Sequence, residues 1–268
     1  MKSVIRQISP ATTVIDITHE IAPHDVRAGG LALARSAQYL APGVVLAVVD
    51  PGVGTTRRGI AVEVGQGESV LVGPDNGLLA PAVALVGGAG TVVELTSDEH
   101  RLSAPGPTFD GRDVFAPAAA HICNGVPIAD LGPEVDAAGL VPGLLALTRQ
   151  EGEGLAAEVL WVDRFGNAQL NVDPEELTAY GSRVQVRSGD ARRVASRART
   201  YADLGAGELG LVVDSYGMVS LALDRRSAAD ELGIAAGSAV NLDPLPEGDD
   251  GRSPGTTTRV TLGDRASR

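Results

Sequence analysis

Apolar runs of strand length alternate with helical segments over the first 140 residues, and this alternation limits the folds open to the chain. The apolar run at residues 43–49 ends at the turn-forming Asp50-Pro51-Gly52. Helical periodicity at 25–40 begins at Asp25, a residue type that caps helices. Further strands are predicted at 13–17, 60–64, 69–72 and 91–95, and further helices at 3–9, 78–85 and 114–123. The pattern predicts an α/β domain whose central sheet is flanked by helices.

The pattern changes after residue 150, where Gly- and Asp-rich turns separate short apolar runs. These runs predict strands at 158–163, 169–172, 183–187, 210–213 and 219–223. We therefore expect an N-terminal α/β domain at 1–145, a linker within 141–154, and a smaller, mostly β, barrel-like domain at 155–245. Residues 246–268 are polar without apolar periodicity and are predicted to be disordered.

Composition narrows the range of partners. The net charge of −12 argues against nucleic acid and against an anionic membrane surface as partners.

The composition also limits the core and the location of the chain. Aromatic residues make up only 3% of the chain, so Val, Leu, Ile and Ala must build the core. A lone cysteine, Cys123, excludes an intrachain disulfide. Neither a signal peptide nor a membrane-spanning apolar stretch is expected, so a cytoplasmic location is predicted.

Polar groups follow directly on predicted strands in several places, and open α/β sheets bind ligands at such strand ends. The segments are 50–54 with Arg57 and Arg58, then 73–77, 109–113 and 163–167. Each segment taken alone also fits an ordinary turn. The four histidines show no metal-ligand spacing, so no metal site is expected. His121 lies in an Ala-rich helical run, where a histidine is more often a core residue than a catalyst.

Six motifs nevertheless occur in one order between residues 1 and 243, and they resemble one family. They are VIDITHEI (14–21), VVDPGVG (48–54), GPDNGLL (73–79), GRDVFAPAAAH (111–121), DRFGN (163–167) and DSYG (214–217). This set resembles the S-adenosylmethionine hydroxide adenosyltransferases, adenosine-forming hydrolases related to the fluorinase and chlorinase. The resemblance implies that water displaces methionine from the ribose C5′ of S-adenosyl-L-methionine, with no metal and no other cofactor. It also implies a homotrimer with each site between the N-terminal domain of one subunit and the β domain of its neighbour.

The same resemblance implies roles for individual residues. Asp50, Arg57 and His121 would hold and activate the attacking water, with Arg58 as the competitor of Arg57. The sulfonium is already a good leaving group, so water is the reactant that must be oriented and relieved of a proton. Which of the three residues takes that proton stays open. The implied substrate-binding residues are Asp163 for the methionine ammonium and, for the adenine pocket, Phe165, Asn167, Ser215, Tyr216 and Leu223.

Two alternatives stay open. A halogenase has the same scaffold, but the fluorinase type carries Tyr, Thr and Ser where this chain has Asp50, Val53 and Gly111. A carboxylate at position 50 would repel a halide and favours water. The family also opens with a strand that ends in a ribose-binding aspartate, and no such strand precedes residue 1 here, so the N-terminal domain is expected to lack it. The second alternative is therefore a non-catalytic protein that binds an adenosyl ligand.

Overall fold

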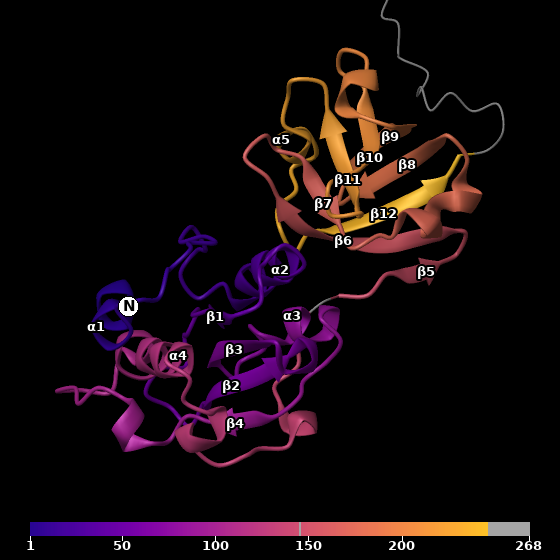
Figure 1. Ribbon diagram of the computed structural model, residues 1–268. Coiled ribbons are helices and arrows are strands. Elements are labelled where there is room, and N and C mark those ends of the chain that lie inside the picture. The colour runs from indigo at the N-terminus through magenta and orange to yellow at the C-terminus, as the bar shows by residue number, and fades with distance from the viewer. Residues whose placement is uncertain (145, 246–268) are drawn as a thin grey trace, which may run out of the picture. The chain divides into compact units, whose positions relative to one another are not determined.

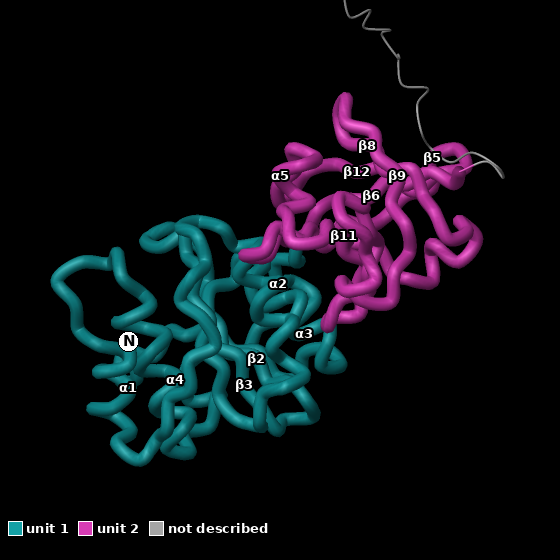
Figure 2. The backbone as a smooth tube through the Cα atoms, turned by 90° about the horizontal axis from the view of Figure 1, so that it is seen from above, with its two compact units in different colours: residues 1–145 teal, residues 146–268 magenta. Residues whose placement is uncertain are grey.

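The computed structural model describes residues 1–144 and 146–245, which form two compact units (Figures 1 and 2). Unit 1 comprises residues 1–145 and unit 2 begins at residue 146. An α/β part followed by a β part confirms the fold class predicted from the sequence. The disorder predicted for residues 246–268 concerns a segment outside the described residues.

Unit 1 has a four-stranded sheet in the order β1-β3-β2-β4 (Figure 1). β1 is parallel to β3, whereas β2 is antiparallel to β3 and β4. The elements are α1 (Lys2–Ile8), α2 (Val26–Ala37), β1 (Val44–Leu46), β2 (Gly59–Val64), β3 (Ser69–Pro74), α3 (Ala80–Leu85), β4 (Val92–Glu94), a π-helical turn (Gly111–Phe115) and α4 (Ala116–Cys123).

The sheet of unit 1 has an apolar cluster on each face because strand side chains alternate in direction. Ile60 and Val62 belong to a cluster that includes residues of α2 and α3. Ala61, between them, belongs to a second cluster with Phe115 and with Ala118 of α4. Helices thus cover both faces, as the sequence pattern predicted.

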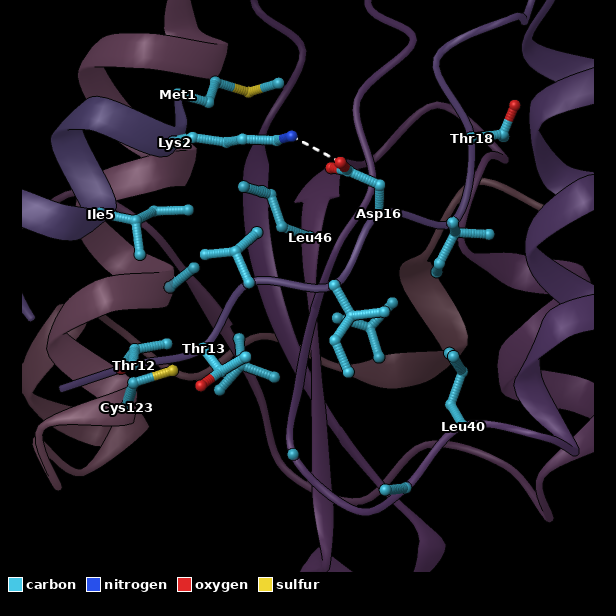
Figure 3. A pocket seen from close by; sticks show the side chains of 18 of the residues that line it. Met1, Lys2, Ile5, Thr12, Thr13, Asp16, Thr18, Leu40, Leu46 and Cys123 are labelled. Atoms are coloured by element: carbon cyan, nitrogen blue, oxygen red, sulfur yellow. Dashed lines mark hydrogen bonds and ion pairs between the residues drawn. The ribbon is translucent and has the colours of Figure 1, made fainter.

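The strand predicted at residues 13–17 is not formed. Ile15 is 80% exposed, and residues 12–17 have no ladder partner in the described structure. β1 is the edge of the sheet, and a pocket of about 400 Å³ lies between it and this segment (Figure 3). In Figure 3, Lys2 points across the pocket to Asp16, with which it forms an ion pair. An apolar segment held away from the sheet edge cannot make the pairings that define a strand.

Gly73 in β3 allows the close approach of β1. A Cβ atom at this position would lie 2.3 Å from the carbonyl oxygen of Ala47. That oxygen belongs to backbone next to the β1–β3 ladder, so it cannot move away freely. We expect Gly73→Ala to lower the free energy of unfolding by about 2 kcal/mol, measured by urea denaturation. The matched control is Gly106→Ala, where a Cβ meets nothing within 4 Å; equal losses in the two variants would contradict this explanation.

Unit 2 is a β-barrel with an added strand. Its sheet has the order β12-β8-β9-β10-β11-β7-β6-β5, and a further β12–β6 pairing closes seven of these strands on themselves. The elements are β5 (Arg149–Glu151), β6 (Gly154–Val162), β7 (Ala168–Leu170), β8 (Arg183–Ser188), β9 (Ala191–Ala198), β10 (Leu209–Val213), β11 (Val219–Leu223), α5 (Ala228–Leu232) and β12 (Ala239–Pro244). In the described parts of both units, no helix has the length and hydropathy needed to cross a membrane.

Candidate functional site

A buried ion pair lies beyond the end of β1. Asp50 is in the turn after this strand, and Arg57 shortly precedes β2. The Nε and Nη2 atoms of Arg57 donate hydrogen bonds to the two carboxylate oxygens of Asp50 at 3.0 and 2.6 Å. The two side chains are only 8% and 7% exposed. The bidentate hydrogen bonds orient both groups. Their burial shields them from bulk water.

A second carboxylate, Asp110, shares the same guanidinium. The Nη2 atom of Arg57 also donates to Asp110, at 2.6 Å. Asp110 directly precedes the π-helical turn, whose last residue is Phe115. The Phe115 ring centroid lies 5.3 Å from the Cζ atom of Arg57. Two carboxylates around one guanidinium give the cluster a net charge of −1 when both are ionised.

The pKa of Asp50 is raised above its ordinary value of 3.8, and burial is the main cause. The charge and hydrogen bonds of Arg57 act in the opposite direction, and the charge of Asp110 raises the pKa further. A carboxylate with a raised pKa is a better proton acceptor than an ordinary aspartate. The cluster therefore contains a buried base beside a fixed cation.

Arg58, the alternative to Arg57 as the partner of Asp50, pairs with Asp75 instead. Its Nε and Nη2 atoms donate to Asp75 at 3.0 and 2.5 Å. Asn76 donates its side-chain amide to the carbonyl of Val49 at 2.9 Å, which fixes the turn after β3. The structure therefore gives Asp50 the partner that the motif spacing favoured, Arg57.

The expected third member, His121, is not brought to this cluster. Its ring packs edge-on against His100, with 4.9 Å between the ring centroids. A continuous helical stretch separates it from Asp110, and residues 110 to 121 span about 16 Å at a rise of about 1.5 Å per residue. Burial, followed by the charge of His100, lowers the pKa of His121. The structure thus joins Asp50 and Arg57, adds Asp110, and places His121 apart.

In unit 2, the first of the expected substrate-binding segments is a tight turn before β7. The Asp163 carboxylate accepts hydrogen bonds from the backbone N–H groups of Phe165 and Asn167 and from the Asn167 side-chain amide, at 2.8 to 2.9 Å. The Phe165 side chain is 72% exposed. Because β7 pairs with β11, Asn167 lies near the end of β11 at Leu223. Asp163 thus shapes the turn that presents Phe165 and Asn167.

The second expected segment, with Ser215 and Tyr216, joins β10 to β11. Asp214 fixes it by accepting hydrogen bonds from the side chains of Gln169 and Ser220 at 2.6 and 2.8 Å. Tyr216 is 47% exposed. Sequence reasoning missed a further aromatic residue, Tyr201, which belongs to none of the motifs. Burial, then the charges of Asp214 and Asp163, raises the pKa of the Tyr201 hydroxyl.

Fold and site together define a class of protein. Unit 1 holds a buried carboxylate–guanidinium cluster at a strand end, and unit 2 presents the exposed rings of Phe165 and Tyr216 on two separate turns. Among the residues that the structure describes, no group of three His, Cys, Asp or Glu side chains is arranged to hold a metal ion. A buried base held beside a fixed cation is typical of an enzyme that activates a small molecule for reaction.

Comparison with known proteins identifies the family. The N-terminal domain of the S-adenosylmethionine hydroxide adenosyltransferases matches residues 1–132, and the C-terminal domain matches residues 157–241. A Salinispora tropica protein named (R)-S-adenosyl-L-methionine hydrolase is 45% identical over 239 residues, 89% of each chain. A Thermus thermophilus protein of the same name is 40% identical over 250 residues, 90% of this chain and 92% of the relative. The chain belongs to the S-adenosylmethionine hydroxide adenosyltransferase family, which confirms the resemblance seen in the six motifs.

More distant matches agree with this assignment. The fluorinase of Actinopolyspora mzabensis is 26% identical over 273 residues, 90% of each chain. The crystal structure of an uncharacterized conserved protein from Thermotoga maritima superposes with a TM-score of 0.82 at 32% identity. It covers 90% of this chain and 93% of that one. The two-domain architecture is therefore shared along nearly the whole chain.

Proposed function

We propose that this protein hydrolyses S-adenosyl-L-methionine to adenosine and L-methionine. The observation that carries the proposal is the buried Asp50–Arg57 pair, in a chain of this family. The water oxygen bonds to the ribose C5′, and the C5′–sulfur bond breaks with its electron pair left on sulfur. The water proton passes to Asp50 and then to solvent, while Arg57 stabilises the negative charge that develops on the water oxygen. The departing thioether is neutral, so no acid, metal or other cofactor is needed to expel it.

The charge of the cluster supports hydrolysis over halogenation. Asp50 and Asp110 outnumber the single guanidinium of Arg57, so the cluster attracts the sulfonium and repels a halide. The names of the Salinispora and Thermus relatives specify the (R) form. We therefore expect the (R)-sulfonium diastereomer to be the preferred substrate.

The substrate pocket and the assembly are parts of the same proposal. Phe165 and Tyr216 would stack on the adenine, Asn167 would bind its edge, and Asp163 would face the methionine ammonium. A homotrimer would bring these turns of one subunit to the cluster of its neighbour. The large exposed area of the Phe165 and Tyr216 rings supports such a covering partner. A cytoplasmic location fits a substrate that is an intracellular metabolite.

Asn167→Ala should raise KM about tenfold and leave kcat little changed, because its side chain contacts the bound base and not the reacting atoms. Initial rates of adenosine formation against substrate concentration check this. The control is Asn241→Ala in the same barrel, whose amide hydrogen-bonds to Glu151. An unchanged KM in Asn167→Ala would remove this residue from the adenine pocket.

Chromatography of each diastereomer after incubation with the protein, with and without chloride, tests the function itself. Equal amounts of adenosine and methionine, independent of chloride, are expected. A chlorinated nucleoside would establish the halogenase instead. Binding seen by calorimetry without any product would establish the non-catalytic binding protein.

A further inference from the structure

We infer that Asp110 is a positioning residue that acts through Arg57 on Asp50 and completes the water-handling cluster in place of His121. The inference rests on the proposed hydrolysis and extends it to a residue outside the predicted Asp50, Arg57 and His121 set. Three observations carry it: a shared guanidinium, an anchored loop, and the distribution of the nearby charges.

The shared guanidinium is held from several sides. Its Nη2 atom donates to Asp50 and to Asp110 at the same distance, 2.6 Å, so neither carboxylate has it alone. The Phe115 ring packs against it. Gly59 makes room for this ring, since a Cβ at Gly59 would lie 2.9 Å from it. Arg57 therefore has little freedom to turn away from the water site.

The loop that carries Asp110 is itself anchored. The backbone N–H groups of Arg112 and Asp113 both donate to the carbonyl of Phe109, at 3.0 and 3.1 Å. The Arg112 guanidinium lies over the Phe109 ring at 5.1 Å and pairs with the Asp113 carboxylate. Phe109 and Arg112, which flank Asp110 and Gly111, are thus held in place by these contacts. The π-helical turn that follows fixes the direction of the Asp110 side chain.

The nearby charges explain what Asp110 does. Within the described part of the chain, the charged groups that act on the Asp50 carboxylate are Arg57 and Asp110. The neighbouring cations Arg58 and Arg112 are engaged by other carboxylates. One positive charge is therefore divided between two negative ones. If Asp110 were neutral, Arg57 would compensate Asp50 alone, and the pKa of Asp50 would fall. Asp110 thus keeps Asp50 basic enough to accept a proton while it holds Arg57 in place.

Asp110→Asn tests this role in the full-length protein. We expect the acid limb of the kcat/KM profile to move down by about one pH unit, and kcat/KM at neutral pH to fall about tenfold. KM should change little, because Asp110 acts through Arg57. Asp110→Glu keeps the charge and should restore part of the rate. The matched control is Asp98→Asn, whose side chain is 97% exposed and pairs with Arg101, outside the cluster.

A second measurement, which does not depend on turnover, follows the protonation of Asp50 itself. Titration of the Asp50 carboxyl carbon by NMR, assigned with Asp50→Asn, should show a lower pKa in Asp110→Asn than in the wild type. An unchanged Asp50 titration, or an acid limb that moves with His121→Asn and not with Asp110→Asn, would overturn the inference. Wild-type protein that forms no adenosine, while the Asp50 titration still depends on Asp110, would refute the proposed function and leave the coupling standing.

Discussion

Replacing Asp50 by Asn should reduce kcat/KM by about 10²–10⁴-fold, the range typical of a lost general base. Asn is similar in size to Asp and still hydrogen-bonds, so the turn after β1 should keep its shape. It cannot accept the proton of the attacking water. The rate of adenosine formation measures the loss, and urea unfolding checks that the variant is folded.

The role of Asp50 also predicts how kcat/KM changes with pH. Since Asp50 must be ionised to act, wild-type kcat/KM should fall as the pH falls through its raised pKa. Asp50→Asn should lose this limb together with the rate. Asp98→Asn, the same change on an exposed side chain, should behave as the wild type. A wild-type rate in Asp50→Asn would show that the cluster does not handle the water.

Replacing Arg57 by Met should produce the largest loss of stability. The change leaves the buried Asp50 carboxylate facing Asp110 with no cation between them. Removing one partner of a buried ion pair typically costs about 3–5 kcal/mol of unfolding free energy, and we expect a loss of this size near neutral pH. Adenosine formation should also disappear, because the water site loses the fixed positive charge of Arg57.

The sign of the pH effect separates this mechanism from lost packing. In Arg57→Met, the folded-state pKa of Asp50 should rise further above 3.8, so the folded state binds more protons than the unfolded state. Stability should then fall as the pH rises from 3.8 through the raised pKa, and mild acid should recover part of the loss. Urea unfolding at mildly acidic and mildly alkaline pH measures this difference. Arg149→Met, on a side chain that is 77% exposed, is the control; an equal, pH-independent loss in both variants would contradict the account.

Local sequence signals predicted much of the fold, where local physics decides the structure. Asp25 caps α2 by accepting from the backbone N–H of Ala28, as its position before the helical pattern indicated. β2 and β3 form where two short apolar runs predicted strands, at 60–64 and 69–72, and they pair with each other. Residues 13–17 and β9 show the limits of this reasoning. The first segment has strand-like residues but no pairing partner, whereas β9 (ARRVASRA) is rich in arginine and is a strand because β8 and β10 pair with it.

The candidate site likewise combines residues that local motifs indicate with a residue that only the fold brings in. Asp50 and Arg57 are seven residues apart, and one motif and its neighbouring arginines indicated both. Asp110 is 53 residues from Arg57, so only the folded chain brings them together. His121 was proposed from its motif, but the helix that carries it extends away from the Asp110 end. Contacts between distant segments, which no local pattern encodes, therefore decided the third member of the cluster.

Hydrolysis in water enriched in ¹⁸O, followed by mass spectrometry of the products, tests the central claim most directly. Attack by water at C5′ predicts that the new 5′-hydroxyl oxygen of adenosine is heavy and that methionine carries no label. Unlabelled adenosine, or label in methionine alone, would contradict displacement by water at this carbon.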